Sequence, residues 1–237
     1  MRTRSTLLVV ALAVAILAGC AGGQMGGGIA SSGPAVDAPK FSVGSRWVYR
    51  GKDGYRQSIN WEETHVVTAI GADGITIRVT ATGAMAAERT EILASPGVVR
   101  VGAVSEFESD RFDPALIRYQ FPLTQGQSWS QTMRNANKPP NPFGAIQRRV
   151  VVDGYESVTT PAGTFNAVRM RIIMQLDDGT VWRFPTECNY VVWYAPEVGA
   201  MVKETQRSYY VEKEGLSGAA VPGQNATIEL VSYTAGR

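Results

Sequence analysis

Strand periodicity runs through almost the whole chain beyond residue 40. Residues 75–82 alternate apolar and polar side chains, and a second apolar stripe takes every other position from Val168 to Leu176. Such alternation is typical of strands with one face on a core and one in solvent. Turns rich in glycine, proline and aspartate separate these runs, at 71–74, 160–163 and 177–179. The sequence therefore predicts an all-β, antiparallel fold.

We expect residues 41–237 to form a single β domain of about ten strands, arranged as a curled sheet or incomplete barrel. Residues 113–117 are the one exception, because Asp113 and Pro114 are suited to start a short helix. The long stretch 135–143, which contains three prolines, predicts an exposed loop. Besides the two runs above, strands are expected at 45–51, 55–70, 88–94, 97–104, 127–134, 146–158, 180–184, 189–194, 200–212 and 226–234.

A weak internal repeat divides this domain. The segment from Phe41 to Trp47 resembles the segment from Phe121 to Trp129, and a valine-rich strand follows each. The resemblance predicts two related meanders, about 41–120 and 121–237. The alternative that any two antiparallel meanders look alike stays open.

The N-terminus has the layout of a secretory signal. Arg2 and Arg4 precede an apolar run, Leu7–Ala18, that is too short to span a bilayer as a mature helix. The run ends in Leu-Ala-Gly-Cys20, which resembles the lipobox of bacterial lipoproteins. That resemblance implies removal of residues 1–19 as a lipoprotein signal peptide and acylation of Cys20, whose acyl chains would anchor the protein to a membrane. A plain signal peptide that happens to contain a cysteine is the alternative.

A lipid anchor would place the protein in the cell envelope. Residues 20–40 consist mainly of glycine, alanine, serine and proline, and predict a flexible tether that follows the anchor. Ala21 follows the cysteine, where an aspartate favours the inner membrane in enteric lipoproteins. By that analogy we expect the periplasmic face of the outer membrane.

The charge balance limits the partners. The full chain has 23 basic and 21 acidic residues, and loss of Arg2 and Arg4 with the signal peptide leaves equal numbers of each. Nucleic-acid binding needs a concentrated basic surface, so no nucleic-acid partner is expected.

The sequence contains no recognisable catalytic or metal motif, and we expect neither an enzyme nor a cofactor. His65 is the only histidine and Gly-x-Ser-x-Gly does not occur. The acidic run 106–113 lacks the glycine and spacing of a calcium loop. With Cys20 acylated, Cys188 has no partner for a disulfide and is expected to be a small buried residue. His65 is expected to be a hydrogen-bonded structural residue.

Two motifs in the second half carry a family resemblance. Pro-Ala-Gly-Thr-Phe lies at 161–165, and Trp-Tyr-Ala-Pro-Glu-Val-Gly lies at 193–199. They resemble a family of bacterial envelope proteins catalogued as a domain of unknown function and related to lipoproteins named for pilus assembly. Glu197 stands where the family usually has glycine. The resemblance implies an antiparallel β fold and brings no catalytic residues. From the residues themselves, we interpret 193–199 as a tight reversal in which Gly199 adopts a positive φ.

Two functions of different kinds fit these features. The first is a non-enzymatic interaction or scaffold module that presents loops or a sheet edge to an envelope protein partner. The second is a carrier of an apolar ligand or lipid. The candidate residues for the carrier are Met170, Ile172 and Met174 on one strand, with Trp182 and Phe184 beside them across a hairpin. A connected apolar cavity would favour the carrier, and a filled core would favour the module.

Overall fold

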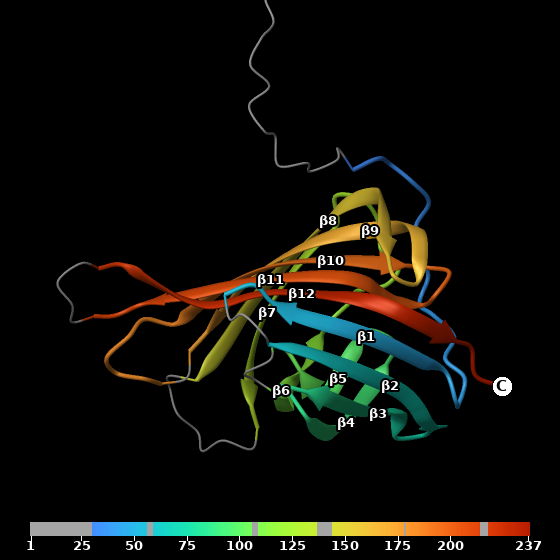
Figure 1. Cartoon of the computed structure of the whole chain (residues 1–237), viewed down its shortest axis with the longest axis horizontal. Coiled ribbons are helices and arrows are strands. Elements are labelled where there is room, and N and C mark those ends of the chain that lie inside the picture. Colours follow the sequence, from blue (N-terminus) through green and yellow to red (C-terminus); the bar gives the residue numbers. More distant parts are fainter. Residues whose placement is uncertain (1–29, 56–58, 106–108, 137–143, 178, 214–217) are drawn as a thin grey trace, which may run out of the picture.

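The protein is a closed antiparallel β-barrel (Figure 1). A computed structural model describes residues 30–55, 59–105, 109–136, 144–177, 179–213 and 218–237. Each strand pairs with the next along the chain, and the last pairs with the first. The strands in these ranges are β1 (Arg46–Asp53), β2 (Asn60–Gly71), β3 (Gly74–Gly83), β4 (Ala87–Ser95), β5 (Val98–Ala103), β6 (Ser109–Ile117), β7 (Ser128–Asn135), β8 (Ala145–Thr160), β9 (Gly163–Leu176), β10 (Thr186–Ala195), β11 (Ala200–Val211) and β12 (Ala220–Thr234). The described part of the chain holds no helix long and apolar enough to cross a membrane.

The all-β antiparallel prediction is confirmed, but the prediction of an open or incomplete barrel is wrong. Strand β1 pairs with β12 from Arg46 opposite Thr234 to Asp53 opposite Ala226. This pairing gives hydrogen-bond partners to backbone groups that two edge strands would leave exposed. The alternating pattern within a strand does not report its neighbours, so closure could not be read from it.

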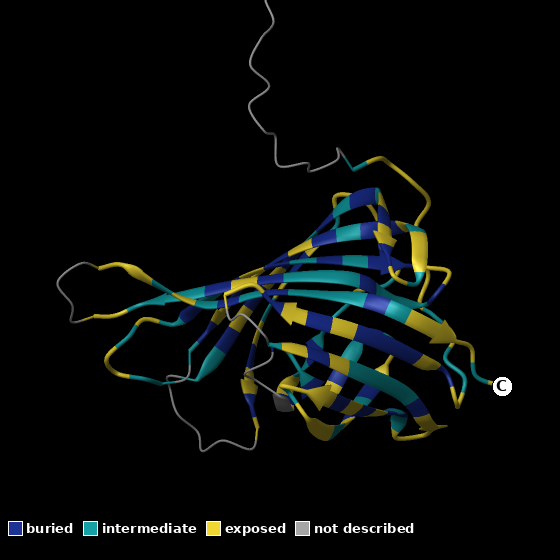
Figure 2. Cartoon of the chain, viewed as in Figure 1, coloured by how far each residue is buried: buried dark blue, intermediate teal, exposed yellow. Residues whose placement is uncertain are grey.

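Buried and exposed residues alternate along the strands, as Figure 2 shows in dark blue and yellow. In β9, for example, Met170, Ile172 and Met174 are buried, whereas Arg171 and Ile173 are exposed. The barrel interior therefore takes one residue of every two, which is the period that the sequence shows.

Two predicted elements differ from the structure. Residues 113–117 belong to strand β6 and not to a helix, because the end of this segment pairs with β5, with Leu116 opposite Val99. Residues 180–184 do not form a strand. They lie in the connection between β9 and β10, and one isolated bridge joins Arg183 to the end of β11. Tertiary pairing overrides the local capping and alternation signals in both places.

The starts of β1 and β7, which follow the two segments that resemble each other in sequence, share their local geometry. Gly44 and Gly126 both adopt positive φ, 86° and 81°. The tryptophan three residues after each glycine, Trp47 or Trp129, is buried and donates its indole N–H to a distant carbonyl oxygen at 3.1 Å.

The described part of the predicted tether lies against the barrel. The Ser31 N–H donates to the Tyr155 carbonyl oxygen at 2.8 Å, and Val36 is 5 % exposed and pairs with Leu123. Phe41 then packs edge-on against Trp47, near the start of β1. The segment from residue 31 to 41 thus crosses one end of the barrel. The remainder of the predicted tether, 20–29, lies outside the described residues, as do the signal peptide and most of the proposed loop at 135–143.

Candidate functional site

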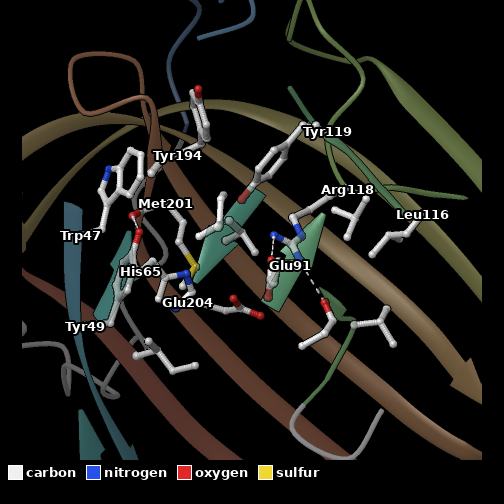
Figure 3. A pocket seen from close by; sticks show the side chains of 18 of the residues that line it. Trp47, Tyr49, His65, Glu91, Leu116, Arg118, Tyr119, Tyr194, Met201 and Glu204 are labelled. Carbon is white, nitrogen blue, oxygen red and sulfur yellow. Dashed lines mark hydrogen bonds and ion pairs between the residues drawn. The ribbon is translucent and has the colours of Figure 1, made fainter. Parts of the chain in front are cut away.

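The barrel encloses a cavity of about 470 Å³ (Figure 3). Its lining comes from most of the strands and from residues 39 and 41 of the segment that crosses the barrel end. Much of this lining is aliphatic or aromatic, including Ile77, Leu93, Val99, Leu116, Ile172, Val192 and Ile228. The cavity exists because inward positions carry side chains that do not fill a closed barrel of this circumference.

An aromatic cluster forms one wall of the cavity. The rings of Tyr119 and Phe121, in the connection between β6 and β7, lie 5.1 and 5.6 Å from the ring of Tyr194 on β10. Both contacts are edge-to-face, the arrangement that aromatic quadrupoles favour. Trp47 and Tyr49 of β1 also line the cavity.

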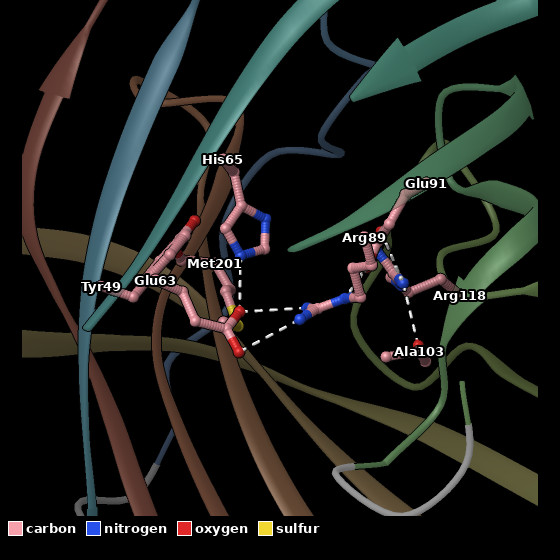
Figure 4. Close-up of polar contacts among 8 residues, drawn as sticks. All are labelled: Tyr49, Glu63, His65, Arg89, Glu91, Ala103, Arg118 and Met201. Atoms are coloured by element: carbon pink, nitrogen blue, oxygen red, sulfur yellow. Dashed lines mark hydrogen bonds and ion pairs between the residues drawn. The ribbon is translucent and has the colours of Figure 1, made fainter. Parts of the chain in front are cut away.

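A chain of charged side chains crosses this largely apolar interior (Figure 4). His65 Nε2 lies 2.8 Å from Glu63 Oε2, and Arg89 Nη2 lies 3.0 Å from the same oxygen. Arg89 Nε lies 3.5 Å from Glu91 Oε1, and Arg118 Nη1 lies 3.1 Å from Glu91 Oε2. Glu63 and His65 share the inward face of β2 because they are two residues apart, as are Arg89 and Glu91 on β4.

These contacts keep the two carboxylates ionised. Burial alone would raise the pKa of Glu63, but the hydrogen bonds and charges of His65 and Arg89 outweigh it and lower this pKa to about 2. The pKa of Glu91 is likewise lowered against the effect of burial, mainly by the Arg118 charge. The same attraction to Glu91 raises the pKa of Arg118 despite its burial. The two carboxylates are thus paired with arginines and are not proton-transfer groups poised near neutral pH.

The structure brings together only part of the sequence-predicted ligand residues. Ile172 lines the cavity, whereas Met170 and Met174 are buried in the packed core. Trp182 and Phe184 lie outside, 50 % and 51 % exposed.

The predicted hairpin that would place the two aromatic residues beside the β9 stripe does not form. Strand β10 takes that place, with Cys188 opposite Met174 and Tyr190 opposite Ile172. The Trp182 ring instead lies 5.8 Å from the Tyr210 ring.

The charged lining residues were not among the sequence-predicted site residues, although the sequence carries a signal for them. Arg89 and Glu91 stand in register with Leu93, and Arg148 stands in register with Ile146 and Val150. A charged residue that stands at an apolar position of an alternating strand is expected to face the barrel interior. A charged residue that faces solvent would instead stand at the position before or after it.

The other residues considered in the sequence analysis lie as follows. His65 is hydrogen-bonded, as expected, but it also lines the cavity. Cys188 is buried and free, as expected, and burial raises the pKa of its thiol to about 11. Among the described residues no cluster of His, Cys, Asp or Glu could hold a metal ion. Cys20 and residues 106–108 of the acidic run lie outside the described residues.

The motif at 193–199 is a tight reversal between β10 and β11, as predicted. Gly199 adopts φ +63°, and its N–H donates to the Ala195 carbonyl oxygen at 3.0 Å. Tyr194 points inward, whereas Trp193 points outward and donates its indole N–H to Glu156 Oε2 at 3.0 Å.

Comparison with known proteins shows a match to one family over part of the chain and a similarity of fold to solved structures. Residues 122–218 match the DUF3108-like family. A search of the curated proteins found no match. The structure is similar to that of a proposed exported protein with a YmcC-like fold from Bacteroides fragilis, with a TM-score of 0.50 and 14 % identity over 85 % of this chain and all of the other. It is also similar to a proposed lipoprotein from Parabacteroides distasonis, with a TM-score of 0.47 and 13 % identity over 85 % of this chain and all of the other.

Proposed function

We propose that this protein is a non-enzymatic, lipid-anchored envelope protein whose barrel binds a small, largely apolar molecule. The cavity of about 470 Å³ inside the barrel carries this proposal. Its size lies within the range of about 300–1,000 Å³ that is usual for small-molecule sites, and its lining combines an apolar majority with a few polar groups. A barrel that served as a scaffold alone would have its interior filled by side chains.

The proposed location rests on the sequence and on the fold. The lipobox-like segment ending at Cys20 predicts an acyl anchor, and the similar exported protein supports a place in the cell envelope. We propose the periplasmic face of the outer membrane, with the barrel held near the membrane by residues 20–29. A carrier in that position would load and release its ligand close to the bilayer.

The charges of the interior support binding in preference to catalysis. Glu63, with a pKa of about 2, is a poor general base at neutral pH. The carboxylates of Glu63 and Glu91 are each occupied by an arginine, so neither is free to attack a substrate.

The interaction module is the second candidate, and one surface feature favours it. Trp182 and Phe184 are half exposed in the connection between β9 and β10. Arg183 lies 4.6 Å from the centre of the Tyr210 ring, and Lys213 lies 5.5 Å from the centre of the Phe184 ring. Exposed aromatic rings beside cations are common at protein interfaces. If this surface is the functional one, Trp182→Ala abolishes capture of an envelope protein partner and leaves ligand binding in the barrel unchanged.

The test of the binding proposal uses two neighbouring isoleucines on opposite faces of β9. All twelve strands of the described residues lie beyond residue 29, so the chain from residue 21 on retains this barrel. Ile172→Trp places an indole in the cavity, whereas Ile173→Trp places it outside, where Ile173 is 58 % exposed. Nile red, an uncharged fluorescent probe, is titrated into each variant after extraction of bound lipid, which mass spectrometry identifies.

We expect saturable binding to the parent and to Ile173→Trp, and at least about tenfold weaker binding to Ile172→Trp, because added volume in a cavity displaces its ligand. Thermal melting confirms that both variants are folded. Absence of saturable binding to the folded parent, together with absence of extracted lipid, would refute the proposal.

A further inference from the structure

Arg148 differs from the other arginines of the cavity lining. It lies on the inward face of β8, is 6 % exposed and lines the cavity. Arg89 and Arg118 are each paired with a glutamate, but among the described residues no carboxylate lies within ion-pair distance of Arg148. Its guanidinium donates to the Ile117 carbonyl oxygen at 2.9 Å and to the Arg118 carbonyl oxygen at 3.4 Å. A guanidinium has five N–H donors, so each terminal nitrogen makes one hydrogen bond and three donors have no partner among the described residues.

A buried guanidinium without a carboxylate is costly. Buried charges in proteins are normally paired, because desolvation disfavours the charged form. Here burial lowers the pKa of Arg148 to about 10, and Arg118 acts in the same direction. Tyr119 and the more distant Glu204 carboxylate raise this pKa without reversing the effect of burial. Arg148 therefore remains a cation at neutral pH in a site that would gain from a counter-charge.

Tyr119 supplies a second donor in the cavity lining, one residue after Arg118, whose carbonyl oxygen accepts from Arg148. Its hydroxyl points into the cavity in Figure 3, and it has no hydrogen-bond partner among the described residues. Burial raises the pKa of this hydroxyl to about 12, against the lowering effects of Arg118 and Arg148. The hydroxyl is therefore protonated and able to donate to an anion beside Arg148.

We propose that the ligand of the barrel carries a single carboxylate, which binds the Arg148 guanidinium and the Tyr119 hydroxyl while its apolar chain occupies the rest of the cavity. The inference rests on the proposed function and names the ligand class of that site, an amphiphile of the fatty-acid kind. The planar guanidinium matches the two oxygens of a carboxylate in a bidentate pair.

Charge and volume both limit the ligand. The charges of Glu63 and Arg89, and of Glu91 and Arg118, neutralise each other in pairs. Glu204 of β11 also lines the cavity, and because its negative charge partly offsets that of Arg148, the lining leaves no positive charge for a second negative charge on the ligand. A monoanion is therefore favoured over a doubly charged phosphate. A volume of about 470 Å³ equals roughly 16 water molecules at about 30 Å³ each, which suits an acyl chain of about a dozen carbons.

Arg148 also has a structural role, which the test must distinguish from its proposed role in ligand binding. Its two hydrogen bonds hold the carbonyl oxygens of residues 117 and 118 in place at the end of β6, where the chain leaves the sheet. Loss of these bonds lowers the melting temperature, but it does not by itself change the preference between an acid and its ester. The ratio of the two affinities is thus the readout that reports on anion recognition.

The experiment measures displacement of Nile red by dodecanoate and by methyl dodecanoate, below micelle-forming concentrations and at pH 8. Arg148→Met removes the guanidinium and keeps a long side chain. Arg149→Met is the matched control, because Arg149 is the next residue on β8 and is exposed on the outer face. Tyr119→Phe removes only the hydroxyl and serves as the second variant if Arg148→Met does not fold.

We expect the parent and Arg149→Met to bind the acid about tenfold to a hundredfold more tightly than the ester, as a charge-assisted hydrogen bond provides. Arg148→Met should bind both compounds alike, and Tyr119→Phe should reduce the preference. Equal binding of acid and ester by the parent, or an unchanged preference in Arg148→Met, would overturn the assignment while the barrel remains a binding protein. Absence of Nile red binding to the folded parent, together with absence of extracted lipid, would instead refute the proposed function itself.

Discussion

Replacement of Glu63 by glutamine should remove a measurable part of the stability of the barrel. The pKa of Glu63 is about 2, whereas its ordinary value is 4.5. At about 1.4 kcal/mol for each pKa unit, this difference corresponds to roughly 3 kcal/mol of stability at neutral pH. Because the pKa is lower in the folded state, the contribution is complete above pH 4.5 and is lost as the pH falls toward 2. By pH 3 about two fifths of it should remain.

The assay is urea unfolding followed by tryptophan fluorescence at several pH values between 7 and 3. Glu63→Gln should be about 3 kcal/mol less stable than the parent at pH 7, and the two should converge as the pH falls. Glu62→Gln is the matched control. Glu62 precedes Glu63 on β2 but is exposed on the outer face, so this variant should follow the parent throughout.

One result would refute this reasoning. If the stability difference between Glu63→Gln and the parent stays constant from pH 7 to pH 3, the contacts with His65 and Arg89 do not hold the carboxylate ionised. The chain of charged side chains would then contribute to the stability of the barrel through packing alone.

Two further predictions concern the anchor and the β10–β11 turn. Cys20→Ser should abolish metabolic labelling by palmitate and release the protein from the membrane fraction, since Cys20 is the predicted acylation site; labelling equal to that of the parent would contradict the anchor. Gly199→Val should destabilise the fold by about 1–3 kcal/mol, because Gly199 adopts φ +63° and a Cβ there would lie 3.1 Å from Pro39. Gly71→Val is the control, as a Cβ at that glycine meets nothing within 4 Å. Equal melting temperatures for the two variants would exclude strain at Gly199.

Features that depend on neighbouring residues were predicted well. The alternation at 75–82 and in β9 identified strands, and the motif at 193–199 identified the reversal and the conformation of Gly199. Side chains two residues apart share a face in any strand, and glycine tolerates a positive φ in any turn. These properties hold whatever the rest of the chain does.

Pairing between distant strands was predicted less well. Nothing local in β1 or β12 shows that they meet, so the barrel was expected to be open. Residues 180–184 alternate like a strand, yet β10 takes the place beside β9 because its residues Cys188 and Tyr190 fill the interior opposite Met174 and Ile172. Competition between segments for one position is settled by packing and not by local preference.

The function likewise depends partly on neighbouring residues and partly on the tertiary structure. The charge pattern, the lipobox-like segment ending at Cys20 and the β-period are properties of consecutive residues, and the prediction of an anchored envelope protein without a nucleic-acid partner rests on them. The cavity is not such a property. It arises because closure brings Arg148 of β8, Tyr119 of the β6–β7 connection and Glu91 of β4 around one space, although more than 50 residues separate the first from the last. Each strand specifies which side chains face inward, but the number of strands and their closure set the space between those side chains.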